Sequence, residues 1–205
     1  MRILAMKIQK GRLYAVDFGE RTVLLDRQIA DAYPLKAGME LPEEAVEQLY
    51  AASQLQRAKE RCLWYLERRD YTARALAGKL YGKFEPEYIA AAVERMQELG
   101  LVNDAAYAQR SAERLLGEQG VSLRMAKQKL LQKGVDRMLI DAALENTAYD
   151  GAAAALALLQ KKYAGKIGTP EDVRRTYQAL ARRGFTHAEI QQALKQMKED
   201  LEFEE

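Results

Sequence analysis

The stretch KLLQKGVDRMLIDAAL, residues 129–144, has the form of a helix end, a glycine stop, a short turn and a second helix. Its apolar residues and its glycine find partners about fifty residues further along. The pairs share one constant offset and are Leu130 with Leu180, Gly134 with Gly184, Ile140 with Ile190 and Leu144 with Leu194. The same pattern of apolar residues recurs about fifty residues earlier, with one residue deleted and the glycine displaced. Its positions there are Leu80, Lys83, Phe84, Ile89 and Val93. The chain is therefore predicted to be a tandem repeat.

Three repeats of three helices each are predicted, over residues 57–103, 104–149 and 150–200. The helices of the first repeat are expected at residues 58–68, 72–83 and 86–99. The apolar positions within one repeat are few and small, so each unit gains stability mainly by stacking on its neighbours. The predicted fold class is mostly α, with tandem three-helix repeats forming an elongated, curved array.

Start signals support the individual helices of the second and third repeats. Asn103 or Asp104 can open the first helix of repeat 2, Ser122 its middle helix and Asp136 its last. In repeat 3, a helix rich in alanine is expected to begin near Asp150. Its second helix has the start Thr-Pro-Glu-Asp at 169–172, and its third has the capping box Thr-His-Ala-Glu at 186–189.

Residues 1–41 differ from the rest, because short alternating apolar runs at 3–8, 13–18 and 22–25 are separated by glycines. This pattern predicts a small antiparallel sheet of three strands. Residues 42–56 form a helical joint, with Pro42 at the first helical position. The pattern leaves open whether the helix that follows is continuous or breaks near Ser53. Residues 201–205 form an acidic tail that is expected to fray.

Composition favours a soluble, helix-rich protein. Of the 205 residues, 48% are apolar and 30% are charged, and only four are proline. No apolar run approaches the ~18 residues of a membrane span, and no basic start leads into a signal core. We therefore expect a cytoplasmic protein that makes no membrane contact.

Enzyme chemistry has little support in the sequence. The only cysteine, Cys62, lies in a helical apolar pattern and is interpreted as a core thiol. The only histidine, His187, falls in a predicted first helical turn and is interpreted as solvated. Neither a zinc site nor a glycine-rich phosphate loop can be built from these residues. We expect no catalytic residue, no metal and no cofactor.

Basic residues concentrate on the middle helix of each repeat. Residues 71–84 and 121–134 contain lysine and arginine and no acid. In repeat 3 the helical phase places Arg174, Arg175 and Arg182 opposite Val173, Tyr177 and Leu180, with Arg183 toward one edge. In repeat 2 the predicted core side is Leu123, Ala126 and Leu130, and the basic residues scatter around it.

These cations are either ordinary solvated side chains or contacts to phosphates or an acidic partner. For Arg68 and Arg69, favourable charge at a helix end is an equally good interpretation. The candidate contacts are Arg68, Arg69, Arg74, Lys79, Lys83, Arg124, Lys127, Lys133, Arg174, Arg175, Arg182 and Arg183. A helix-turn-helix that reads DNA sequence is disfavoured, because no middle helix starts with a suitable set of Asn, Gln and Arg and no dimerisation element is evident. We expect a monomer.

Several segments together resemble the bacterial RecX regulators of the RecA recombinase. They are Tyr65-Leu66, Arg68-Arg69, Tyr71-Thr72, Lys79-Leu80, the run Leu-Gly-Leu-Val-Asn-Asp at 99–104, Tyr107-Ala108, Gly120, Leu130 and Lys133-Gly134-Val135. The resemblance is close over residues 57–146 and looser over the third repeat.

The resemblance implies a non-enzymatic protein that binds the RecA filament and restrains its recombination and ATPase activities. It also allows contact with single- or double-stranded DNA. Two other functions remain open: a stand-alone helical repeat protein that binds nucleic acid without sequence preference, and a repeat scaffold for another acidic protein. The cations given above are inferred from charge and helical phase, and none is matched to a known family contact.

Overall fold

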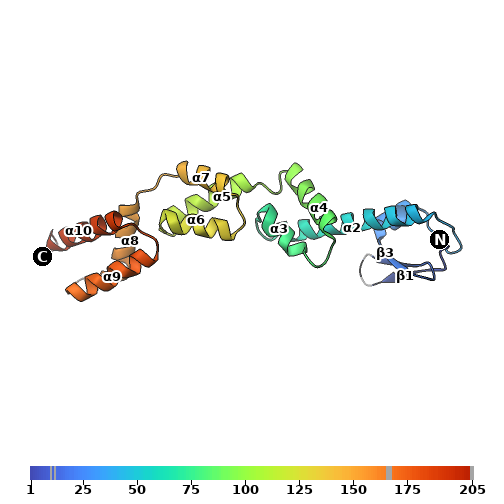
Figure 1. The fold of residues 1–205 in the computed structure, drawn as a ribbon, viewed down its shortest axis with the longest axis horizontal. Coiled ribbons are helices and arrows are strands. Elements are labelled where there is room, and N and C mark those ends of the chain that lie inside the picture. Colours follow the sequence, from blue (N-terminus) through green and yellow to red (C-terminus); the bar gives the residue numbers. More distant parts are fainter. Residues whose placement is uncertain (10, 12, 165–167, 204–205) are drawn as a thin grey trace. The chain divides into compact units, whose positions relative to one another are not determined.

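The structure, a computed structural model, describes residues 1–9, 11, 13–164 and 168–203. These residues form three strands, ten α-helices and one short π-helical segment (Figure 1). The chain divides into two compact units, Met1–Val102 and Asn103–Glu205. The prediction of a mostly helical protein with a small N-terminal sheet is confirmed.

The N-terminal sheet is antiparallel in the order β1-β2-β3. Its strands are β1 (Ala5–Gln9), β2 (Leu13–Asp17) and β3 (Thr22–Asp26). Val16 at the centre of the sheet faces Met6 on one side and Val23 on the other. One face of a sheet this small needs cover. The first half of α2 (Glu43–Leu66) supplies that cover, through the buried side chains Val46 and Leu49 (Figure 1).

A short helix, α1 (Arg27–Ala32), follows β3 directly and was not predicted. The Asp26 carboxylate accepts a hydrogen bond from the Gln28 amide at 2.9 Å, so the last residue of the strand is also the N-cap of the helix. The six-residue element is too short to show helical periodicity in the sequence. Its Ala30 is buried against the sheet.

The helix after residue 42 is continuous, which settles the question that the sequence left open. Ser53 does not break α2, because its hydroxyl accepts the Asp26 amide at 2.6 Å and lies 3.5 Å from the Leu24 carbonyl. A residue that could have ended the helix instead ties it to the outer edge of β3. Pro42 is at the N-cap, one position earlier than expected, and the helix begins at Glu43.

The second half of α2 is the first helix of repeat 1, together with α3 (Ala73–Leu80) and α4 (Pro86–Glu98). Their core is compact and includes Ala58, Leu76 and Met96. Cys62 is fully buried in it, as predicted. The middle helix ends at Leu80, three residues earlier than expected, because Gly82 at φ +76° turns the chain. Lys83 therefore lies in the turn and not on the helix.

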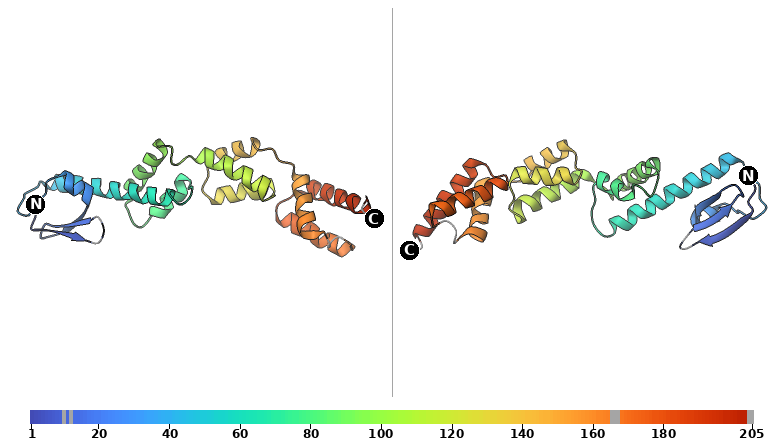
Figure 2. Two further views of the ribbon diagram at one scale, coloured as in Figure 1. Left: turned by 180° about the vertical axis from the view of Figure 1, so that it is seen from behind. Right: turned by 60° about the horizontal axis from the view of Figure 1, so that its bottom comes forward.

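The second unit contains two further three-helix sets (Figure 2). Each set has its own cluster of buried apolar residues. One comprises α5 (Asp104–Glu113), a π-helical turn η1 (Arg114–Glu118), α6 (Leu123–Gln132) and α7 (Arg137–Glu145). The other comprises α8 (Gly151–Tyr163), α9 (Pro170–Arg182) and α10 (His187–Phe203). In all three sets the first and third helices form the main packed pair, which is the structural form of the sequence repeat.

The predicted N-caps are present in the second unit. Asn103, not Asp104, caps α5, with its side chain accepting the Ala106 amide at 2.9 Å. Ser122 caps α6 and Asp136 caps α7. α10 continues to Phe203, so the expected acidic tail is helical over residues 201–203, and residues 204 and 205 lie outside the described residues.

The capping box at the start of α10 is formed in both directions. The Thr186 amide donates to Glu189 Oε2 at 2.7 Å, and the Glu189 amide donates to Thr186 Oγ1 at 3.3 Å. We predict that Thr186→Ala lowers local stability by about 1 kcal/mol, the usual value for a lost hydroxyl cap. Amide hydrogen exchange in the first turn of α10 measures this, with the exposed Gln191→Ala on the same helix as the control. Equal exchange in the two variants would contradict the prediction.

Candidate functional site

The exposed side of α2 near its end carries a group of aromatic and cationic side chains. Trp64 is 42% exposed, although tryptophan is usually well buried. The Arg68 guanidinium carbon lies 3.6 Å from the centroid of its ring, and that of Arg61 lies 5.3 Å away. Residues three and four apart are neighbours on a helix surface, so the positions of Arg61, Trp64 and Arg68 follow from their spacing.

The group continues through two tyrosines, Tyr65 on α2 and Tyr71 in the turn before α3. Tyr65 meets the Trp64 ring edge-on at 5.0 Å and the Tyr71 ring at 5.9 Å. The Arg69 guanidinium lies 4.6 Å from the Tyr71 centroid, and Lys83 Nζ lies 3.4 Å from the Tyr65 hydroxyl. We call this set, Arg61, Trp64, Tyr65, Arg68, Arg69, Tyr71 and Lys83, the Trp64 cluster.

The Trp64 cluster combines rings and cations in a preformed arrangement. Each exposed cation–π contact is worth about 0.5–1 kcal/mol, which holds the arginines near the rings without burying them. Arginine and exposed aromatic rings are the residue types that bind phosphates and stack on bases, and they also dominate protein interfaces. Arg68 lies 4.0 Å from the Glu67 carboxylate, which offsets part of its charge.

The other two candidates of repeat 1 lie on α3. Arg74 and Lys79 are both exposed. Lys79 is in the last turn, where a positive charge is favourable beside the helix C-terminus.

The candidates of repeat 2 have different surroundings from one another. Lys127 forms an ion pair with Asp141 and so joins α6 to α7. Arg124 is exposed in the first turn of α6. Lys133 is at the C-cap of α6 and lines a hollow whose other residues come from α5, α6 and η1 with its C-cap. The expected core side of α6 needs one correction: Leu123 is 41% exposed, because the buried stripe consists of Ala126 and Leu130 only.

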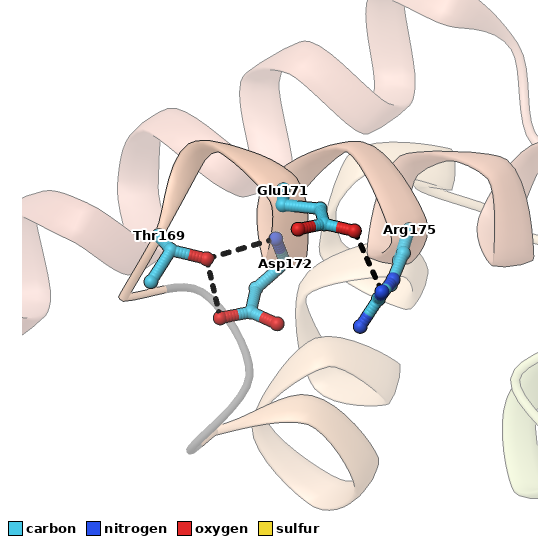
Figure 3. Close-up of polar contacts among 4 residues, drawn as sticks. All are labelled: Thr169, Glu171, Asp172 and Arg175. Carbon is cyan, nitrogen blue, oxygen red and sulfur yellow. Dashed lines mark hydrogen bonds and ion pairs between the residues drawn. The ribbon is translucent and has the colours of Figure 1, made fainter.

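Three candidates of repeat 3 lie exposed on α9, as the helical phase predicted. They are Arg174, Arg175 and Arg182. The first turn of this helix is acidic, and Figure 3 shows Arg175 reaching back to Glu171, whose carboxylate is 2.6 Å away. The same view shows Thr169 capping the helix and donating to the Asp172 carboxylate at 2.6 Å. Both members of the Arg175 pair are more than two-thirds exposed, so the pair contributes little stability.

Arg183 has a structural role that the sequence did not indicate. Its guanidinium donates to the Tyr163 hydroxyl at 3.0 Å and to the Ala179 carbonyl at 3.3 Å, so it joins α9 to α8. His187 is exposed, as expected, and its Nδ1 lies 2.8 Å from the Tyr177 hydroxyl.

Sequence reasoning identified Arg68, Arg69 and Lys83 but not the ring that organises them. The sequence did contain a signal for Trp64, because Arg61 lies three residues before it and Arg68 four residues after it. The apolar pattern around Cys62 obscured this spacing. Arg61 was missed for the same reason.

The fold defines a helical protein of tandem three-helix domains. No helix among the described residues is both long and apolar enough to cross a membrane. Models of the first, second and third three-helix domains of RecX match residues 58–96, 103–144 and 148–194. The chain belongs to the RecX family, as the resemblance predicted.

Relatives called "Regulatory protein RecX" show how far the similarity extends. The protein of Halorhodospira halophila is 32% identical over 148 residues, which cover 70% of this chain and 90% of that protein. The protein of Thermobifida fusca is 32% identical over 164 residues, covering 78% and 84% of the two chains. That of Streptococcus gordonii is 26% identical over 205 residues, covering 96% and 78%.

Two crystal structures share the fold. One of a regulatory protein RecX superimposes with a TM-score of 0.67 at 22% identity, over 93% of this chain and 97% of that one. One of RecX from Lactobacillus salivarius gives 0.62 at 20% identity, over 72% and 98%.

Proposed function

We propose that this chain is a non-enzymatic regulator that binds the RecA recombinase filament and lowers its recombination and ATPase activities. Membership of the RecX family supports a regulatory role. The Trp64 cluster supports the contact itself, because it is an exposed, preorganised surface of a kind that interfaces favour. We further propose that the protein acts in the cytoplasm as a monomer, and that its three-helix repeats are the units that contact the filament.

Bound DNA is proposed as part of the contact surface. The cations of the Trp64 cluster and the exposed arginines of α9 would meet phosphates, and the rings would stack on bases. Lys127 and Arg183 are weaker candidates than the sequence suggested, since each already joins two helices.

The test is an ATPase and strand-exchange assay with RecA on single-stranded DNA and substoichiometric amounts of this protein. We expect both rates to fall. Replacing Trp64, Arg68 and Arg69 together by alanine should weaken filament binding about tenfold, because stacking and charge are lost at once. Fluorescence anisotropy with labelled filaments measures the affinity. The single variant Trp64→Phe, which keeps an aromatic ring, should bind more tightly than the triple variant.

Two control variants separate surface loss from folding. Tyr33→Ala removes another exposed aromatic ring, and Arg95→Ala removes another exposed arginine, which pairs with Glu98. Neither should change filament affinity. A matched triple variant, with alanine for Arg174, Arg175 and Arg182, tests the α9 surface. No effect of the unmodified protein on RecA at any ratio would sink the proposal.

The second candidate function is stand-alone nucleic-acid binding, which the ring and cation composition of the Trp64 cluster favours. Anisotropy on bare DNA across a salt series separates the two functions. Tight binding with a log-log salt slope of several units would favour stand-alone binding, since each neutralised phosphate contributes about 0.9 on duplex DNA. Stand-alone binding also requires that the protein does not bind RecA.

A further inference from the structure

A hollow of about 290 Å³ lies between α6 and the end of the preceding helix. Three of its lining side chains are cationic: Arg114, Lys129 and Lys133. Tyr107, Gln119 and Gln132 add neutral polar groups, and none of the described residues that line the hollow carries a carboxylate. The hollow is therefore a concentration of positive charge with a defined shape, in which Lys133 joins Arg114 and Lys129. Arg124 and Lys127, the other candidate cations of repeat 2, do not line it.

The π-helical turn η1 brings two of these residues together. The Gln119 amide donates to the Arg114 carbonyl at 3.0 Å, a bond between residues five apart. At about 100° per residue, an ordinary α-helix would place these residues about 140° apart, on different faces. The wider turn stacks them one above the other. Insertions of this kind are often found at functional sites.

The orientation of Gln119 makes the wall rich in donors. Lys129 Nζ donates to Gln119 Oε1 at 3.2 Å, so the side-chain amide oxygen already accepts one hydrogen bond and the side-chain nitrogen is a donor. Arg114 presents a planar fork of N–H groups, and lysine ammonium groups are donors only. A ligand with several acceptor oxygens and negative charge satisfies such a wall.

Phosphate fits these features better than carboxylate does. A carboxylate carries one charge and two oxygens, whereas a terminal phosphate or pyrophosphate group carries up to two charges and three free oxygens. A strand phosphate carries one charge, but successive phosphates along the strand can meet several cations at once. Arginine binds phosphate through two parallel hydrogen bonds, and lysine acts as a point charge beside it. We propose that the hollow is a phosphate-binding site, filled by a free polyphosphate or by a phosphate of a nucleic-acid strand. The site is separate from the Trp64 cluster and does not depend on the proposed contact with RecA.

The test uses the full chain and two probes, inorganic pyrophosphate in calorimetry and a labelled single-stranded oligonucleotide in anisotropy. The double variant Arg114→Gln with Lys129→Gln removes two charges and keeps polar side chains. We expect it to weaken binding of at least one probe tenfold or more. The control, Lys161→Gln with Lys162→Gln, removes equal charge from exposed positions of the same unit that belong to no proposed contact surface, and should change that affinity less than twofold.

The outcomes distinguish the two sources of phosphate. If the variant Arg114→Gln with Lys129→Gln loses pyrophosphate binding and the control does not, the hollow is a site for free polyphosphate. If that variant loses only oligonucleotide binding, the hollow binds a strand phosphate. The proposal is overturned if the double variant of the hollow and the control lose equal affinity for the probes, or if the unmodified chain binds neither probe. Thermal unfolding of both variants shows that they are folded. Inhibition of RecA is measured separately, so a failure here leaves the proposed function standing.

Discussion

Replacing Gly184 by alanine is expected to lower the stability of the second unit by about 2–4 kcal/mol. Gly184 has φ +86°, where a side chain costs roughly 1–2 kcal/mol. The added Cβ would lie 2.7 Å from the Ser122 hydroxyl. That hydroxyl is buried, donates to the Arg183 carbonyl at 2.7 Å and accepts the Met125 amide at 3.2 Å. Displacing it removes the cap of α6 and leaves buried polar groups without partners, which adds about 1–2 kcal/mol.

Amide hydrogen exchange of α6 and α9 is the suitable measurement, since a chain of two units need not unfold in one step. Gly120→Ala is the matched control: Gly120 also has positive φ, +54°, but an added Cβ would meet nothing within 4 Å. It should show only the cost of the backbone conformation. In Ser122→Ala the effect of Gly184→Ala should shrink, because the atom it displaces is gone. Equal losses at Gly184 and Gly120 would contradict the proposed clash.

The contact between Ser122 and Gly184 shows which parts of the fold the sequence could predict. The repeat was visible because Leu130 and Leu180 recur at a fixed offset and glycine ends each helix. Ser122 was predicted as a cap from local rules alone. Its second bond, to a carbonyl 61 residues away, depends on how repeats 2 and 3 pack, and no local pattern encodes that. The same limit explains Ser53, which local propensity treats as a possible helix break.

Candidate site residues were predictable by charge but not by environment. Arg174 and Arg182 lie on the exposed face that the helical phase assigned, because a single regular helix sets their directions. Arg183 and Lys127 were grouped with them, and their partners come from other helices. Arg114 was not considered at all. Its place in the basic hollow depends on a π-helical turn, which the 3.6-residue period cannot indicate.

The stability of the first unit is expected to fall between pH 9 and pH 11 because of Cys62. The thiol is fully buried in the core of repeat 1, and burial raises its pKa from 9.0 to about 11. Above pH 9 the unfolded chain loses this proton while the folded chain keeps it, so alkali favours unfolding. The contribution of the neutral thiol is complete below pH 9 and is lost as pH rises through 11. At 1.36 kcal/mol per pKa unit, the loss is roughly 3 kcal/mol in total.

The window from pH 9 to 10 separates this thiol from three tyrosines. Burial also raises the pKa of Tyr50, and it raises the pKa of Tyr88 and of Tyr149 to about 12, so their effects become large only above the ordinary tyrosine value of 10.0. Urea unfolding at pH 8, 9 and 10, followed by the fluorescence of Trp64 in the first unit, should therefore show a downward slope of stability against pH that Cys62→Ala removes. The variant is expected to be less stable at every pH, because it leaves a small cavity, so the comparison is between slopes. Parallel slopes in the two proteins would show that the thiol is ionised equally easily in the folded and unfolded chains, and the burial argument would fail.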